Sequence, residues 1–185
     1  NGVNVAFDIF AEPAENILIG EISHTCVTPT CDTAGEQVFI SGAEISRIND
    51  ARMLANPTKN GNGLEIDMST IAQGSAAAAE GYFGPNNLFH YFIMEAEGSA
   101  LNAGTDEVSI TRARCRDGRN MRVQGGVSQA TGIVEIINYG TATIVADPNA
   151  AGMGTYSFRS NNIGTCPATV TVQYNEATAT VGTSR

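Results

Sequence analysis

A chain of 185 residues fits one domain, and its 42 % hydrophobic content with a mean hydropathy of -0.07 is enough for a buried core. Its 19 acidic and 10 basic residues give a net charge of -9, and Lys59 is its only lysine. This balance argues against nucleic acid and anionic membranes as partners. No apolar run approaches the roughly 20 residues of a membrane span. Because the chain starts at Asn1, we expect a mature extracellular or cell-surface protein, processed after a secretory signal peptide.

Residues 1–10 alternate between apolar and polar side chains, a period typical of a half-buried strand. The residues on the apolar face are Val3, Val5, Phe7 and Ile9. A polar stretch with Pro13 follows and separates this strand from the next one. The segment can therefore reach either its own sheet or a neighbouring molecule.

Four cysteines form one close pair, Cys26 and Cys31, and one distant pair, Cys115 and Cys166. Zinc sites usually have two close cysteine pairs or spaced histidines, and His24 is the only histidine nearby. The pattern therefore predicts two disulfides formed in an oxidising compartment. Of the three connectivities, we favour Cys26–Cys31 with Cys115–Cys166.

Two segments have features of short helices. The sequence Ser41-Gly42-Ala43-Glu44 matches a capping box, and apolar residues then recur at helical spacing up to Asn56-Pro57. We therefore expect a helix over 42–55. A run of small residues ending in Gly81 predicts a second short helix over 75–81.

The other elements are expected to be short strands separated by turns. They are predicted at 17–22, 37–40, 64–68, 88–96, 108–115, 132–138, 141–146, 154–159 and 168–174. The sequence therefore indicates an all-β fold, an antiparallel β-sandwich or jelly roll with one or two short helices. We expect a single secreted domain over 1–185, stapled by its disulfides and ending in a tail over 176–185.

No catalytic pattern stands out. The chain has two histidines, His24 and His90, and it lacks a Gly-x-Ser-x-Gly elbow, a phosphate-binding loop and a His-Glu-x-x-His helix. We therefore expect that the protein is not an enzyme. The aromatic residues gathered over 82–92 are attributed to core packing, and a lectin-like surface is the alternative.

Acidic residues suggest a metal only weakly, because pairs at i and i+2 on a strand usually form a solvated face. No cofactor is certain, and if a metal ion binds, oxygen ligands favour calcium. The densest acidic group consists of Glu95, Glu97, Asp106 and Glu107.

Five of the nine arginines fall within eleven residues, namely Arg112, Arg114, Arg116, Arg119 and Arg122. On a strand the first three share one face, and the cysteine between them points to the core. Such a stripe on an acidic protein can pair with carboxylates of another copy. Pairing within the chain and binding of an anionic surface polysaccharide are the two alternatives.

The run Ala168–Tyr174 alternates cleanly and ends in a tyrosine. Together with the alternating residues 1–10, it resembles the chain ends of secreted pilins that polymerise by donor-strand complementation. The resemblance implies a sandwich that lacks one strand and is completed by residues 1–10 of a neighbour. The continuation past Tyr174 and the cysteine positions differ from the chaperone–usher pattern, so other extracellular filament or tube subunits stay open.

The sequence thus leads to the hypothesis of a structural subunit of an extracellular filament, pilus or tube that assembles with copies of itself. The expected interface residues are those of the N-terminal strand and Arg112, Arg114 and Arg116. Two other functions stay open. One is a monomeric adhesin or carbohydrate-binding module, and the other is a viral capsid or decoration jelly roll.

Overall fold

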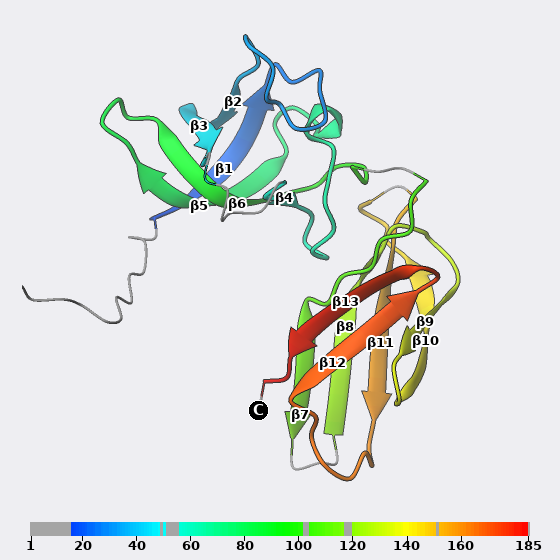
Figure 1. Cartoon of the computed structure of the whole chain (residues 1–185). Coiled ribbons are helices and arrows are strands. Elements are labelled where there is room, and N and C mark those ends of the chain that lie inside the picture. Colours follow the sequence, from blue (N-terminus) through cyan, green and yellow to red (C-terminus); the bar gives the residue numbers. More distant parts are fainter. Residues whose placement is uncertain are drawn as a thin grey trace, which may run out of the picture.

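A computed structural model describes residues 16–48, 50, 56–101, 104–116, 120–150 and 152–184. Within these ranges the fold is almost entirely β, as expected, and it consists of two lobes (Figure 1). The first lobe contains β1 (Asn16–His24), β2 (Val38–Ile40), β3 (Ala43–Arg47), β4 (Thr58–Lys59), the 3-10 turn η1 (Met68–Thr70), β5 (Ala76–Phe83) and β6 (Phe89–Ala96). The second contains β7 (Arg112–Arg116), β8 (Asn120–Val127), β9 (Ile133–Ile136), β10 (Gly140–Ala146), β11 (Gly154–Ser160), β12 (Thr169–Tyr174) and β13 (Ala177–Gly182).

The sheet of the first lobe closes on itself. β1 pairs with β2 and β5, β2 with β3, and β5 with β6, all antiparallel, while β3 and β6 pair in parallel. The closed order β1-β2-β3-β6-β5 is the strand order of the OB-type barrel, a small Greek-key barrel. β4 adds to the free part of β6.

The sheet of the second lobe has the order β13-β12-β9-β10-β11-β8-β7. Its two ends meet where Ser184, just after β13, bridges Arg114 of β7 in parallel. The amide of Ser184 donates to the carbonyl of Ala113 and its carbonyl accepts from the amide of Cys115, each at 3.0 Å. The C-terminal end of the chain thereby fastens β7, which carries the arginine stripe.

Each lobe has its own hydrophobic cluster. Ile40 and Phe89 are fully buried in the first, and Val123 and Ile136 in the second. Met153, from the loop between β10 and β11, belongs to the cluster of the first lobe. The lobes therefore touch through this loop, although the other members of each cluster come mainly from one lobe.

Polar contacts reinforce this junction. The side chain of Ser109 donates to the carbonyl of Asn62 at 2.5 Å, and the Asn62 side-chain amide donates to Asp147. Asn60 donates to the sulfur of Met153 at 3.4 Å. The turn over 60–64 is thus the part of the first lobe that holds the second.

Both disulfides form with the favoured connectivity, Cys26–Cys31 and Cys115–Cys166. None of the helices in the described ranges is long and apolar enough to cross a membrane.

The two predicted helices are wrong in the described residues. β3 occupies 43–47, and Ser41 and Gly42 form the two-residue turn that joins it to β2, with φ of 49° and 79°. Positive φ at both central residues is the conformation of a tight β-hairpin turn, so the apparent capping box is a turn signal. The rest of the predicted helix, residues 49 and 51–55, lies outside the described residues.

The second predicted helix is the strand β5. β5 pairs with β1 on one side and β6 on the other, and Ala77 and Ala79 fill the narrow interior between them. Burial in a closed sheet thus overrides the helix propensity of alanine.

Two further expectations need correction. The tail predicted over 176–185 forms β13, which pairs with β12 along its whole length. The strand predicted over 64–68 is reduced to isolated bridges at Glu65 and Ile66, after which Asp67 caps η1. The proposed donor strand over 1–10, with Val3, Val5, Phe7 and Ile9, lies outside the described residues.

Candidate functional site: an arginine cluster on the second lobe

The site is built on β7, whose residues alternate between the core and solvent. Cys115 is buried and is tied to Cys166, which fixes the inward face of the strand. Arg112 and Arg116 are exposed and Arg114 is half-buried, so all three point outward as predicted.

Two neighbouring strands extend this stripe into a cluster. In the register of the sheet, Arg114 lies opposite Arg122 of β8, and Arg122 lies opposite Arg159 of β11. Three guanidinium groups therefore stand in one row across three adjacent strands. Like charges directly opposite each other destabilise a sheet, so an anion bound near this row would reduce the repulsion between the arginines. We call Arg112, Arg114, Arg116, Arg122 and Arg159 the arginine cluster.

The arginine cluster surrounds a pocket of about 330 Å³ that Asn120, Met121 and Asn161 also line. None of the described residues that line this pocket is a carboxylate, and in the same part of the chain none of the five arginines forms an ion pair. The Nε atom of Arg114 is buried and has no hydrogen-bond partner. A buried donor without an acceptor costs free energy, which an oxyanion seated in the pocket would recover.

Charge is divided unevenly along the chain. Residues 1–96 carry twelve acidic and three basic residues, a net charge of -9. Residues 97–111 add three acidic residues, while residues 112–185 carry four acidic and seven basic residues, a net charge of +3. The first lobe is therefore acidic and the second basic.

Arg159 was not predicted as part of the site, because it lies 37 positions after Arg122 in the sequence. Only the pairing of β8 with β11 brings the two together. Counting the charges in each half of the chain could have revealed that one lobe is acidic and the other basic. A search for charged clusters that are local in the sequence cannot reveal this.

The predicted calcium residues are not gathered into a site. Glu95 is an exposed residue of β6 between two buried ones and Glu97 follows the strand, whereas Asp106 and Glu107 precede β7. In the ranges that the structure describes, no group of three or more His, Cys, Asp or Glu side chains is arranged to hold a metal ion. The requirement for calcium stays a prediction.

The first lobe has a second concave surface. A groove of about 500 Å³ runs along the loop after β1 and strands β2 and β3. Its acidic residues are already engaged, since Asp32 pairs with Arg47 at 2.9 Å and Glu44 accepts from Gln37 at 3.3 Å. Glu36 is bound to its own loop, so the groove lacks a free charged group of the kind found in the arginine cluster.

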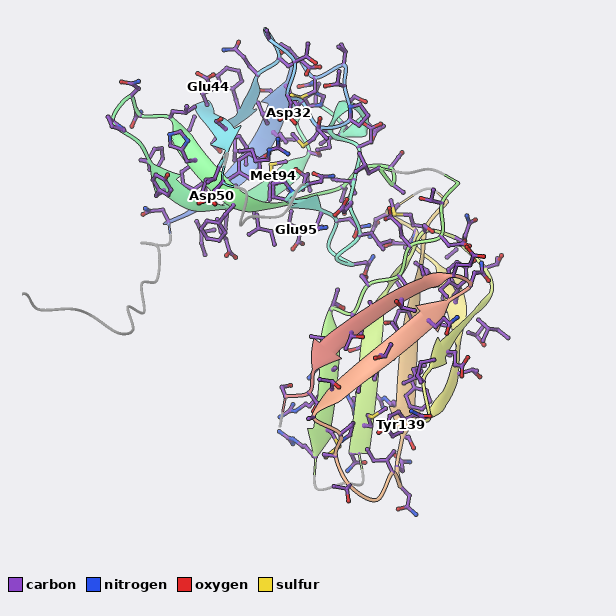
Figure 2. The ribbon with its side chains drawn as sticks, in the orientation of Figure 1. Asp32, Glu44, Asp50, Met94, Glu95 and Tyr139 are labelled. Atoms are coloured by element: carbon purple, nitrogen blue, oxygen red, sulfur yellow. A yellow bond between two sulfur atoms is a disulfide. The ribbon has the colours of Figure 1, made fainter. Side chains whose placement is uncertain are left out.

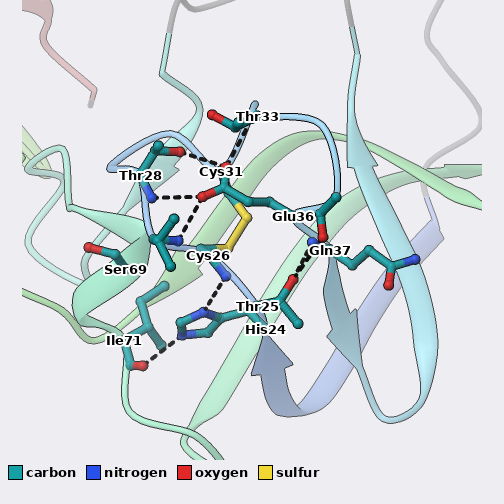
Figure 3. Close-up of a disulfide and its surroundings, with 12 residues drawn as sticks. His24, Thr25, Cys26, Thr28, Cys31, Thr33, Glu36, Gln37, Ser69 and Ile71 are labelled. Atoms are coloured by element: carbon teal, nitrogen blue, oxygen red, sulfur yellow. Dashed lines mark hydrogen bonds between the residues drawn. A yellow bond between two sulfur atoms is a disulfide. The ribbon is translucent and has the colours of Figure 1, made fainter.

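His24 has a structural role in this lobe (Figure 3). Its Nδ1 accepts from the amide of Cys26 at 3.2 Å, and Nε2 lies 2.8 Å from the carbonyl of Ile71. Because Nδ1 is an acceptor, Nε2 carries the proton in this arrangement. The imidazole therefore ties the disulfide loop to the segment after η1. His90, the other histidine, lies against the ring of Tyr82 with a centroid distance of 5.4 Å.

The aromatic residues over 82–92 divide between core and surface. Phe89 and Tyr91 are buried, as core packing requires, and burial raises the pKa of Tyr91. Tyr82 and Phe83 are exposed, so core packing explains only part of the aromatic group.

Comparison of the chain with protein-family models, with curated proteins and with solved structures finds no match.

Proposed function

We propose that the protein is a secreted structural subunit that assembles head to tail, with the arginine cluster of one copy bound to the acidic first lobe of the next. The observation that carries this proposal is the separation of charge between the lobes, together with an arginine cluster that forms no ion pair with any described carboxylate. Opposite charges on different faces favour a heterologous contact, and such contacts build open chains when the rotation does not close.

Secretion fits the two disulfides, because structural disulfides persist in oxidising compartments. Both lie in the described residues, one in each lobe, and they leave no free cysteine there.

Strand exchange by residues 1–10 is the second contact that we propose. Among the described residues, β13 pairs only with β12 along 177–182, so its other edge is available to an added strand. β13 contains no charged residue and no proline, the features with which proteins usually block a sheet edge. The alternating residues 1–10 have a suitable pattern to pair with it.

The experiment is sedimentation velocity with negative-stain imaging over a range of ionic strength. Raising the salt from about 0.1 M to about 1 M shortens the Debye length from roughly 10 Å to 3 Å, so we expect assemblies at low salt that dissolve at high salt. The double variant Arg114→Glu/Arg122→Glu should stay monomeric at low salt. A chain lacking residues 1–10 should form oligomers without extended fibres.

Wild-type protein that is monomeric at every salt concentration would contradict assembly.

The buried Nε of Arg114 favours a second function, the binding of an anionic polysaccharide by a monomeric adhesin. That function predicts a complex with a carboxylated or sulfated polysaccharide at low salt, lost in the same double variant.

A further inference from the structure

The outer face of β1, β5 and β6 combines exposed apolar residues with carboxylates. Cross-strand pairing aligns Ile17 with Glu80 and Glu80 with Ile93, and it aligns Ile19 with Ala78 and Ala78 with Glu95. We call this surface the glutamate face. Its outward side chains are Ile17, Ile19, Glu21, Ala76, Ala78, Glu80, Ile93 and Glu95.

This face has properties of an interface that is uncovered in a single chain. Ile17 is 62 % exposed and Ile19 is 69 % exposed. A shallow pocket of about 350 Å³ lies beside them, with Ala78 and Glu95 in its wall. Exposed apolar side chains therefore stand beside carboxylates on this face, and both can take part in a protein interface.

The carboxylates of the glutamate face have no ion-pair partner in the described part of the chain. Among the described residues Arg47 pairs with Asp32, and Lys59, which lies opposite Glu95 in the register of β4 and β6, pairs with Glu65. Glu21, Glu80 and Glu95 come from three different strands of the sheet. In Figure 2, Glu95 lies on the lower side of the first lobe, whereas Asp32 and Glu44 lie at its upper side.

The glutamate face and the arginine cluster each span three adjacent antiparallel strands, which lie about 4.8 Å apart. The glutamate face carries one carboxylate on each strand. In the arginine cluster, β7 carries three arginines at alternate positions, and β8 and β11 carry one each. The sheet of the second lobe also exposes Ile133 and Val145, at 62 % and 65 %, on its outward side. Val145 lies opposite Thr155 of β11, four positions before Arg159, so this apolar area is on the same side of the sheet but outside the arginine cluster.

We infer that the glutamate face of one copy receives the arginine cluster of a second copy. This inference rests on the proposed head-to-tail assembly and names the surface of the first lobe that takes part in it. Charge complementarity selects the second copy as the occupant, because in the described part of the chain neither the glutamates of this face nor the arginine cluster form ion pairs.

Charge reversal on each side, followed by mixing, tests the inference. The variant Glu80→Arg/Glu95→Arg and the variant Arg114→Glu/Arg122→Glu should each show only the monomer peak in sedimentation velocity at low salt. An equimolar mixture of the two should form larger species again, because the first keeps an intact arginine cluster and the second an intact glutamate face. Circular dichroism of each variant checks that it is folded.

The control is Glu44→Arg/Glu176→Arg, which changes the net charge equally at two exposed positions outside both surfaces. It should assemble as the wild type does. If Glu80→Arg/Glu95→Arg assembles like the wild type, the glutamate face is not the docking surface, although the proposed function still holds. If the wild type does not assemble, the proposed function itself fails. The conservative variant Glu80→Gln/Glu95→Gln should weaken assembly without abolishing it, and an undiminished signal would also contradict the inference.

Discussion

Glu36 organises the loop that the Cys26–Cys31 disulfide closes (Figure 3). Its carboxylate accepts from the Thr28 hydroxyl at 2.6 Å and from the amides of Val27, Thr28 and Thr33 at 2.7 to 2.9 Å. The Thr28 hydroxyl and these amides hold the pKa of Glu36 at about 2, below its ordinary value of 4.5. A carboxylate with a lowered pKa stabilises the fold in its ionised form.

The substitution Glu36→Gln should therefore lower stability in a pH-dependent way. The contribution of Glu36 is complete above about pH 4.5 and is lost as the pH falls through about 2, because the unfolded chain binds the proton first. We expect the melting temperatures of wild type and variant to differ at pH 6 and to converge by pH 2. Thermal unfolding followed by circular dichroism measures this.

Glu44→Gln is the matched control, because Glu44 is exposed and accepts one hydrogen bond of 3.3 Å. A gap between wild type and Glu36→Gln that stays constant from pH 6 to pH 2 would contradict the role of the Glu36 charge.

Among the elements, β7 depends most on a distant covalent link. Its Cys115 is bound to Cys166, 51 residues later and shortly before β12. The Cys26–Cys31 disulfide closes a separation of only 5 residues. A cross-link removes more entropy from the unfolded chain when the loop that it closes is longer. The Cys115–Cys166 bond should therefore contribute more to the free energy of unfolding than the Cys26–Cys31 bond.

Replacing Cys115 and Cys166 together by alanine should lower the free energy of unfolding by about 4 kcal/mol, and replacing Cys26 and Cys31 by about 2 kcal/mol. Urea unfolding of both double variants and the wild type gives the two differences. If the two double variants lose equal free energy of unfolding, or the short-loop variant loses more, then native contacts and not chain entropy determine how much each disulfide stabilises the fold.

At the scale of the whole molecule, the question is how many units unfold, because the two sheets have separate hydrophobic clusters. Gly81 and Gly125 provide matched probes, one in each lobe. A Cβ atom would lie 2.0 Å from the His90 carbonyl oxygen at Gly81 and 2.0 Å from the Ser109 carbonyl oxygen at Gly125. Alanine at either position would push the neighbouring backbone away. This overpacking should lower the free energy of unfolding by about 3 kcal/mol.

We expect calorimetry to resolve two unfolding transitions. Gly81→Ala should lower the midpoint temperature of one, and Gly125→Ala that of the other. Gly182→Ala should leave both unchanged, because its nearest neighbour atom is 3.9 Å from the added Cβ. If both variants lower one common transition, the lobes form the single unit expected from chain length, joined through the Met153 loop.

Local patterns in the sequence predicted the all-β class and most of the strands, and they favoured the disulfide pairing that forms. Alternation suffices for this, as in β7, where Cys115 had to face the core and the arginines solvent. Two-residue turns were harder to interpret, since Ser41-Gly42 satisfies the pattern of a helix start and of a hairpin. The alanine strand β5 could not be predicted either, because its two partners are distant in the sequence.

Only the tertiary structure decided how the charges are grouped. The row of Arg114, Arg122 and Arg159 depends on the register of three strands, and the glutamate face depends on the pairing of β1, β5 and β6. Such groupings arise from contacts between residues far apart in the chain. The sequence by itself therefore determined what each strand exposes, and long-range pairing determined which exposed residues act together.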